Sequence, residues 1–339
     1  MAEKGGQEEQ GKMRDTRQWE SAFGTRLRIV ILSALFLAGA HAGEESKQNA
    51  TMGSGEMFDA IAPRYDLINS FLSLGMHTWW RARMVAALDL QPGDTVLDLG
   101  TGTADVAIAV AKVLKKRSRG KPLSADAVVG IDPSHNMLAH GRRKVASAGF
   151  EATTVRLVQG DAQDLSRTLM PLQHFDAATM AFAIRNVPDR LAALKSIASH
   201  LKPGAKLAVL ELGEPSFPPA RLFVKYCVPF IGALLSGGAR AEYEHLEKSV
   251  LNFHSKDFAG LIEEAGLKLV NIRMMNFGSV GLYVAQKPID HSSSSQVRKQ
   301  QVSAGGAQGD TGMQTESSQI AQSNTAGDGD IIAGSSELR

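Results

Sequence analysis

Three aspartates stand at or near the ends of short apolar runs, where they could bind a ligand at one edge of a sheet. Asp98 interrupts the first run, Asp132 ends the second, and Asp161 follows the third. The carboxyl ends of parallel strands meet at one edge, and open α/β sheets bind their ligands there. A carboxylate after the second strand can accept hydrogen bonds from both hydroxyls of a ribose, and one after the third can accept from the exocyclic amine of adenine. Each aspartate alone could be a helix cap or a turn residue, but the three together indicate a site for a nucleoside.

A glycine-containing turn follows the first apolar run, in the stretch DTVLDLGTGTAD at residues 94–105. Gly100 and Gly102 let the backbone turn sharply and approach a ligand closely, which a Cβ atom would prevent. A dinucleotide-binding turn has a third Gly or Ala three residues after the second Gly, but this chain has Asp105 there. Its charge would repel a pyrophosphate at the same helix end, whereas the cationic sulfonium of S-adenosylmethionine (SAM) meets no such conflict. The turn therefore favours SAM over NAD.

The pattern around these residues predicts strands that alternate with helices. Apolar runs bounded by turns predict strands, and apolar residues at three- and four-residue spacing predict helices. The expected strands are 96–99, 128–131, 154–158, 175–181, 206–211, 268–275 and 278–286, and the expected helices lie within 56–90, 106–116, 133–145, 189–201 and 255–265. Strands and helices that alternate in this way imply a parallel sheet, and the short turn at 276–278 predicts a hairpin at its end.

The composition excludes several kinds of site. The chain has 339 residues and a formal net charge of +2, which is too balanced to indicate binding to nucleic acid. Its single cysteine, Cys227, excludes an intramolecular disulfide framework and a multi-cysteine zinc site, and we expect no metal. With 43% hydrophobic residues, the chain can bury one substantial core that carries extensions.

The two ends of the chain differ from the region between them. Residues 1–51 are predicted to be a targeting or disordered leader that contains the apolar segment 29–40. This segment is too short for a typical transmembrane helix and suits a targeting signal; alternatively, it is a buried or interfacial anchor helix. It predicts an organellar or secretory-routed protein that is peripheral to a membrane. Residues 289–339 are rich in Ser, Gln, Gly and Asp and are predicted to be a disordered tail, which leaves 52–288 as the folded domain.

The stretch 65–80 resembles the signature of a known family, the UbiE/MenG methyltransferases, which use SAM to methylate carbon in ubiquinone and menaquinone biosynthesis. It reads YDLINSFLSLGMHTWW and departs from the signature at Ile68, where the family usually has Met. FAIRNV at 182–187 and LKPG at 201–204 resemble two further family stretches. The resemblance extends over residues 57–287. It implies a Rossmann-like class I SAM-dependent methyltransferase fold, α/β, with a mostly parallel seven-stranded sheet and a C-terminal antiparallel hairpin.

The strand ends and the resemblance together predict the residues that bind SAM. By resemblance, Thr103 and Ala162 join the aspartates and the glycines of the turn. The full set is Asp98, Gly100, Gly102, Thr103, Asp132, Asp161 and Ala162. Three positions depart from the family pattern: Ala104 replaces a Gly of the turn, and Ala181 and Gly213 each replace a Ser. Lost backbone freedom or a lost hydrogen bond at an Ala costs on the order of 1 kcal/mol, so we expect weaker but retained SAM binding.

A second set of residues would serve methyl transfer to a reduced quinone. Loss of a hydroxyl proton makes an adjacent ring carbon nucleophilic, and this carbon attacks the sulfonium methyl directly. His77 is the candidate base because the pKa of histidine lies near neutrality, and Arg185 could stabilise the developing phenolate. Tyr65, Asp66 and Asn69 would shape the site. Alternatively, His77 and Asn69 only tie the N-terminal helices together.

The predicted function is SAM-dependent C-methylation of a prenylated quinol precursor, of the demethylmenaquinol type or its ubiquinone-pathway equivalent. The alternative is a non-catalytic methyltransferase-like scaffold subunit of a quinone-biosynthetic complex, which Ala104 and Ala181 would suit. An NAD-dependent oxidoreductase is disfavoured by Asp105. The partners implied are the lipophilic quinol, a membrane surface, and a homodimer or a quinone-biosynthetic complex. The apolar stretch 213–238 would cap an apolar substrate or, alternatively, form core helices.

Overall fold

A computed structural model gives the fold and describes residues 59, 66, 69–70, 73, 75–171, 173–222, 225–226 and 248–289. The predicted leader 1–51, the tail from 290 onward, Tyr65 and residues 227–238 of the predicted cap lie outside the described residues. By its internal contacts the chain separates into units 1–289 and 290–339, and everything described below belongs to the first. None of the described helices has the length and apolar character needed to span a bilayer. The same part of the chain contains no group of three or more side chains arranged to hold a metal ion.

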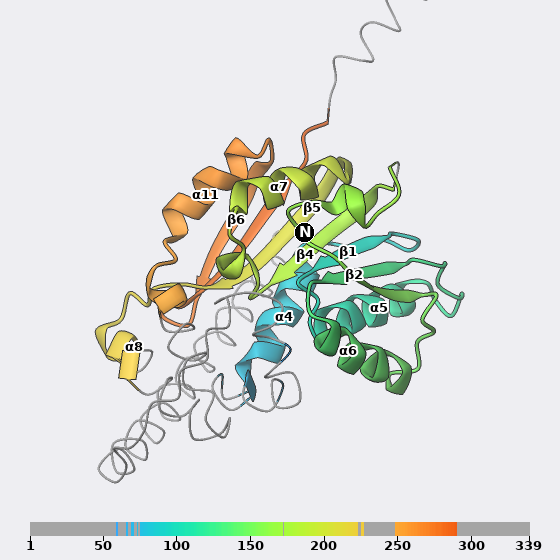
Figure 1. Ribbon diagram of the computed structural model, residues 1–339, viewed down its shortest axis with the longest axis horizontal. Helices are drawn as coiled ribbons and strands as arrows, with labels where there is room; N and C mark the ends of the chain where they lie inside the picture. The colour runs from blue at the N-terminus through green and yellow to red at the C-terminus, as the bar shows by residue number, and fades with distance from the viewer. Residues whose placement is uncertain are drawn as a thin grey trace, which may run out of the picture. The chain divides into compact units, whose positions relative to one another are not determined.

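Among the described residues, seven strands form one sheet in the order β3-β2-β1-β4-β5-β7-β6 (Figure 1). The strands are β1 Val96–Leu99, β2 Val128–Asp132, β3 Val155–Gln159, β4 Phe175–Ala181, β5 Leu201–Leu212, β6 Lys268–Met275 and β7 Val280–Gln286. The first five strands pair in parallel, and β7 runs antiparallel to both β5 and β6. The predicted α/β fold, with a parallel sheet and a C-terminal hairpin, is confirmed.

Helices cover both faces of this sheet. The described helices are α4 Met76–Ala87, α5 Asp105–Arg117, α6 His135–Ser147, α7 Arg190–Ser199, α8 Pro218–Leu222 and α11 Ser255–Glu264, with the short 3₁₀ helices η1 Leu165–Arg167 and η2 Ile184–Asn186. One apolar core joins α4, α5 and α6 to the sheet, and a second joins α7 and α11 to its other face (Figure 1). The sheet is therefore the middle of three layers, as in doubly wound α/β folds.

The burial of the elements explains why the sequence pattern predicts them. Every residue of β1 and β2 is buried, because helices cover both faces, and the strands therefore appear in the sequence as mainly apolar runs without the alternation of a half-exposed strand. In α5 the buried residues Val106, Val110 and Leu114 recur every four residues on the face that packs on the sheet. These elements accordingly begin and end close to their predicted ranges.

The strand β5 begins earlier than predicted. The sequence predicts a helix that ends at Leu201 and a turn after it, but Leu201 already pairs with Phe175 of β4. The ladder then resumes at Lys206, so the residues of the predicted turn form a bulge in the strand. Pro203 has no N–H group that would need a partner in the ladder, and Gly204 adopts the left-handed backbone conformation (φ 81°).

The order of the strands reverses between β1 and β4. From β1 the chain proceeds through β2 to β3, and it then returns to form the other half of the sheet from β4 onward. The carboxyl ends of β1 and β4 therefore form the switch point at which such sheets bind ligands. The β6–β7 turn lies at the same edge, because Val280 pairs with Leu212 at the end of β5. This edge is called the carboxyl edge below.

Candidate active site

The turn after β1 is shaped by glycines in the left-handed region. Gly100 (φ 59°) packs so tightly that an added Cβ would lie 2.4 Å from the Cβ of Ala183, which follows β4. At Gly102 (φ 53°) an added Cβ would meet its nearest atom, the Cε of Met137, at 3.9 Å, which is an ordinary van der Waals distance. Gly102 is only partly buried, so its backbone is partly exposed at the carboxyl edge. Ala104 is also left-handed (φ 66°), and its Cβ costs about 1–2 kcal/mol of strain there.

Asp98 anchors this turn to the neighbouring strand. Its side chain is buried and accepts hydrogen bonds from the hydroxyls of Thr101 in the turn and Thr179 in β4, both at 2.7 Å. Burial raises the pKa of Asp98 to about 6, although both hydroxyls act to lower it. Asp98 thus supports the turn from inside the protein.

Asp132, at the end of β2, contacts the turn directly. Its Oδ2 accepts a hydrogen bond from the amide of Gly102 (2.8 Å), and its Oδ1 accepts one from the amide of Ser134 (2.9 Å). Burial raises the pKa of Asp132 to about 6, and the two hydrogen bonds lower it in part. An ionised carboxylate has about four acceptor positions, so both oxygens can still accept from the hydroxyls of a ligand.

Asp161 and Ala162 follow β3 at the same edge. The amide of Gly160 donates to the carbonyl of Asp132 (3.1 Å), which brings the ends of β3 and β2 together. Asp161 is exposed, and its carboxylate accepts from the backbone amide (2.9 Å) and the side-chain Nε2 (2.8 Å) of Gln163. Asp161 therefore stabilises its own turn, which is the alternative role that the sequence allows for each of the aspartates. Its carboxylate is exposed, so it also remains accessible to a ligand. Ala162 is buried.

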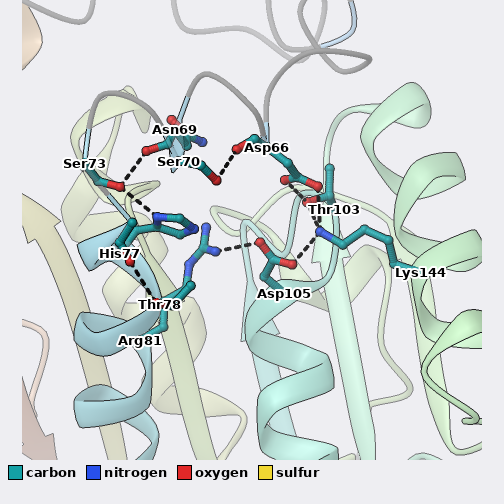
Figure 2. A network of polar contacts seen from close by, with 11 residues as sticks. Asp66, Asn69, Ser70, Ser73, His77, Thr78, Arg81, Thr103, Asp105 and Lys144 are labelled. Carbon is teal, nitrogen blue, oxygen red and sulfur yellow. Dashed lines mark hydrogen bonds and ion pairs between the residues drawn. The ribbon is translucent and has the colours of Figure 1, made fainter.

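A network of charged side chains joins the N-terminal segment to the turn (Figure 2). Asp66 accepts hydrogen bonds from the hydroxyl of Thr103 (2.7 Å) and from Nζ of Lys144 in α6 (2.7 Å). Lys144 also pairs with Asp105, whose other oxygen accepts from Arg81 of α4 (2.6 Å). The predicted residues Asp66 and Thr103 are therefore in direct contact, and Lys144 holds them to the start of α5.

Asp105 repels anions less than the sequence alone suggests. Burial acts to raise its pKa, but the charges and hydrogen bonds of Arg81 and Lys144 outweigh burial and lower the pKa overall. The carboxylate is therefore ionised and is paired with two cations. Because these cations compensate its charge, Asp105 does not by itself favour SAM over a pyrophosphate-containing ligand.

His77 lies in the first turn of α4 and is partly buried. Its Nδ1 is 2.7 Å from Oγ of Ser73, and the Ser73 hydroxyl donates to the backbone carbonyl of Asn69 (2.6 Å). Burial lowers the pKa of His77 and the charge of Arg81 lowers it further, whereas two nearby aspartates raise it. The imidazole is therefore neutral near pH 7, as a proton acceptor must be.

Arg185 lies in η2, after β4, and forms a buried ion pair with Glu211 of β5. Its Nη1 is 2.5 Å from Oε1 of Glu211 and also donates to the carbonyl of Phe182 (2.8 Å). Glu211 holds the backbone as well, because its Oε2 accepts from the amide of Arg185 (3.1 Å). Within the described residues, Nε of Arg185 is buried and has no hydrogen-bond partner. A buried donor without a partner costs about 1–3 kcal/mol, so this nitrogen is a candidate to bind a ligand oxygen.

Phe182 connects the segments that carry the two predicted catalytic residues. Its backbone is left-handed (φ 57°), a conformation that is rare for a bulky residue and occurs often at functional sites. Its ring meets Trp80 of α4 nearly edge-on, with centroids 6.2 Å apart, and the guanidinium of Arg81 lies 6.0 Å from its centroid. The helix that carries His77 therefore packs against the segment that carries Arg185.

The sequence reasoning missed four residues of this site, which are Ser73, Arg81, Lys144 and Glu211. Ser73 stands four residues before His77, and this helical spacing is a signal that could have indicated the contact. The other three gave no such signal, because their partners lie in segments that only the folded chain brings near. Asp161, by contrast, was predicted, but its described hydrogen bonds stay within its own turn.

Comparisons with known proteins agree on one family. The sequence model of the ubiE/COQ5 methyltransferase family matches residues 44–287. The demethylmenaquinone methyltransferase of Bacillus cereus (strain ATCC 10987 / NRS 248) is 33% identical over 240 residues, which cover 69% of this chain and 94% of the relative. The protein of the same name from Bacillus anthracis (strain CDC 684 / NRRL 3495) gives the same figures. Among solved structures, the cyclase SpnF aligns with a TM-score of 0.50 and 15% identity over 69% of this chain and 95% of SpnF, which shows the fold alone.

The residues at the switch point fit SAM. The backbone of Gly102 is partly exposed at the carboxyl edge, and Asp132 at the end of β2 can accept hydrogen bonds from ribose hydroxyls. The left-handed Ala104 leaves both of these features in place. The family match spans most of the chain outside its two ends. The chain therefore belongs to the UbiE/COQ5 methyltransferase family, and it is a SAM-dependent methyltransferase of quinone biosynthesis.

Proposed function

We propose that this protein methylates a ring carbon of a demethylmenaquinol-type prenylated quinol. The observation that carries the proposal is the 33% identity, over 94% of the relative's length, to a protein named demethylmenaquinone methyltransferase. When bound, SAM supplies an electrophilic methyl group. The non-catalytic scaffold is not favoured, because the acidic strand end at Asp132 and the buried pair of Arg185 with Glu211 are both present.

The chain's own residues would hold the cofactor at the turn after β1. Asp132 would accept hydrogen bonds from the ribose hydroxyls, and the exposed carboxylate of Asp161 would accept one from the adenine amine. Gly100 and Gly102 leave two positions of the turn without a side chain, and Asp98 fixes the position of the turn. Thr103 and Ala162, which the family resemblance also predicts, lie in the turn and directly after Asp161. These roles are supported by placement at the carboxyl edge.

His77 would accept the hydroxyl proton of the quinol. Its neutral imidazole can take a proton, and loss of that proton from the quinol raises the electron density at the adjacent ring carbon. This carbon would take up the methyl group that bound SAM supplies. Loss of the proton from the methylated ring carbon then restores the aromatic ring. His77 and Asn69 also hold the N-terminal segment together through Ser73. The same contacts would therefore serve both a structural role and the proposed catalytic role.

Arg185 would stabilise the phenolate oxygen that develops on the quinol. Its buried Nε–H is unpartnered among the described residues and can donate to that oxygen. The interaction is strong because the guanidinium is buried and because its position is already fixed by Glu211 and Phe182. Asp66 would hold the N-terminal segment against the turn, and Tyr65 remains a predicted residue of the site outside the described part of the chain.

A direct assay tests the proposed reaction. The purified full chain is incubated with SAM and either a short-chain demethylmenaquinol or a ubiquinone-pathway precursor. The masses of the products are then determined by mass spectrometry. We expect the demethylmenaquinol to gain one methyl group on carbon and the other substrate to react more slowly. Failure to methylate either quinol, by a protein that still binds SAM in calorimetry, would overturn catalysis and favour the scaffold.

The carboxyl edge is also proposed to contact a membrane, where a prenylated quinol resides because its chain is apolar. Phe217 and Phe277 lie there with ring centroids 5.2 Å apart, and their residues are 42% and 39% exposed. Leu222 of α8 is exposed as well, and the exposed Met274 lines a cavity of about 340 Å³ beside them. Exposed apolar groups of this kind mark interaction surfaces.

The location and assembly of the protein are proposed from the sequence. The leader 1–51, with its short apolar segment 29–40, would route the protein to an organelle or the secretory pathway. A fusion of this leader to a fluorescent protein tests the proposal, and diffuse fluorescence throughout the cell would contradict it. A homodimer or a quinone-biosynthetic complex also stays a prediction, for which light scattering of the purified chain is the first measurement.

A further inference from the structure

Ser73 has two polar partners but only one proton to donate. Its Oγ is 2.6 Å from the backbone carbonyl oxygen of Asn69 and 2.7 Å from Nδ1 of His77 (Figure 2). A carbonyl oxygen can only accept hydrogen bonds, so the single hydroxyl proton of Ser73 is directed to Asn69. The remaining contact, between Ser73 and His77, must then take its proton from the imidazole.

The Ser73 hydroxyl determines which nitrogen of the imidazole carries the proton. Nδ1 of His77 donates to Oγ of Ser73, so Nδ1 is protonated. A neutral imidazole has one ring proton, and Nε2 is then the nitrogen with a free electron pair. Within the described part of the chain, no hydrogen bond to Nε2 is found. An unconstrained histidine in water prefers the opposite tautomer, with its proton on Nε2, so the arrangement around Ser73 has to impose this one.

We infer that Ser73 is a positioning residue, which fixes the tautomer of His77 so that Nε2 is left as the proton acceptor. The inference rests on the proposed role of His77 in methyl transfer. The residues Asn69, Ser73 and His77 follow one another at intervals of four, a spacing that places successive side chains on one helical face. Ser73 lies in a turn, Gly75 (φ 76°) caps the start of α4, and the contact between Ser73 and His77 therefore joins this turn to the helix.

A matched serine lies on the same segment. The hydroxyl of Ser70 donates to the backbone carbonyl of Asp66 at 2.7 Å, four residues earlier, as Ser73 does to Asn69. Ser70 has no described contact with His77. Ser70→Ala therefore removes an equivalent hydroxyl-to-carbonyl bond without removing the contact to the imidazole, and it controls for loss of order in the N-terminal segment.

The test is nitrogen NMR of the full chain with labelled histidine, in which the two ring nitrogens have distinct shifts in each tautomer. His77→Gln identifies the signals of His77. We expect the wild type and Ser73→Thr to show a proton on Nδ1, and Ser73→Ala to shift toward a proton on Nε2. Methyl transfer should fall roughly tenfold in Ser73→Ala, with unchanged SAM affinity, and should stay near the wild-type rate in Ser73→Thr and Ser70→Ala.

The outcomes separate this inference from the proposed function. A wild-type signal with its proton on Nε2, or a tautomer that Ser73→Ala leaves unchanged, overturns the inference whatever the activity. An equal loss of rate in Ser70→Ala also overturns it, because the effect would then come from the segment as a whole. If no quinol is methylated by the wild type, the proposed function fails, while the NMR result still decides which tautomer Ser73 imposes.

Discussion

Asp132 has to be ionised to accept hydrogen bonds through both oxygens, yet its environment opposes ionisation. Burial raises its pKa from 3.8 to about 6, and the amides of Gly102 and Ser134 offset this only in part. Asp98 has a similarly raised pKa, but its oxygens bind two threonine hydroxyls. Asp98 and Asp132, which both contact the turn after β1, therefore titrate in the same pH range. Only Asp132 is proposed to contact the cofactor.

We expect the affinity for SAM to fall as the pH drops below about 6. The pKa of Asp132 is higher in the folded protein than its ordinary value, so the carboxyl group becomes protonated already in this range and one oxygen becomes a donor. Calorimetry between about pH 7.5 and about pH 5 should show a dissociation constant that rises by up to roughly tenfold per pH unit at the acidic end. Asp132→Asn should bind SAM about 1–3 kcal/mol more weakly at neutral pH and lose most of this pH dependence. Full pH dependence in that variant would assign the effect to Asp98 or another group.

A second prediction at the residue scale concerns Nε of Arg185, which has no hydrogen-bond partner in the part of the chain that the structure describes. Arg185→Lys keeps a positive charge beside Glu211 but removes the Nε–H. We expect kcat to fall by about 10²–10³-fold, because one donor to the developing oxyanion is lost, while SAM affinity stays within about twofold. Single-turnover rates and SAM calorimetry measure the two effects, and the melting temperature monitors the ion pair. A variant with the wild-type rate would show that Nε does not act on the substrate.

At the scale of elements, the sequence pattern predicts those strands and turns that depend mainly on which of their own residues are buried. β1 and β2 were predictable because burial on both faces makes them mainly apolar, and the β6–β7 hairpin was predictable from the short turn between its two strands. The polar contacts of the site could not be predicted in this way. Lys144 lies 39 positions from Asp105, and Arg185 lies 26 from Glu211, so each pairing depends on how separate elements pack. The strand-end aspartates were found because strand ends are local features, whereas Arg81 and Lys144 pair with Asp105 from distant elements.

The tight packing of the turn after β1 against the segment after β4 predicts how glycine substitutions change the free energy of unfolding. Gly100→Ala would place a Cβ 2.4 Å from the Cβ of Ala183, in a left-handed backbone. Gly149→Ala, after α6, has the same kind of backbone (φ 76°) but no atom within 4 Å of the new Cβ. We expect Gly149→Ala to lower the free energy of unfolding by about 1 kcal/mol and Gly100→Ala to lower it by about 1–3 kcal/mol more.

Urea unfolding of these variants separates strain from collision. The difference between Gly100→Ala and Gly149→Ala estimates the cost of the collision, because both positions have positive φ. Ala183→Gly should restore most of that difference when it is combined with Gly100→Ala, compared with its effect alone. Equal losses in the two single variants, or no recovery in the double variant, would show that the turn and the segment after β4 separate easily.

At the scale of the whole described domain, the carboxyl edge gathers the parts that a lipophilic substrate requires. The switch point, Arg185 after β4 and the β6–β7 turn all lie along it. Phe217 and Phe277 expose their rings at this edge. An enzyme that takes its substrate from lipid gains when the mouth of its site faces the bilayer, because the prenyl chain then need not enter water.

We therefore expect the carboxyl edge to bind membranes through these aromatic residues. The double variant Phe217→Ser and Phe277→Ser should lose roughly tenfold in binding to vesicles of phosphatidylcholine and phosphatidylglycerol, because each ring contributes on the order of 1 kcal/mol when it enters the interface. The matched control is Met170→Ser with Ile289→Ser. Both of these residues are more exposed (75% and 57%), and Ile289 follows the end of β7, beside Gly204 near the start of β5, away from the carboxyl edge. Co-flotation with vesicles measures binding. Methyl transfer to a prenylated quinol in the vesicles should fall with it, whereas transfer to a water-soluble quinol without the chain should not. Equal loss in both double variants would mean that the carboxyl edge is not the membrane-binding surface.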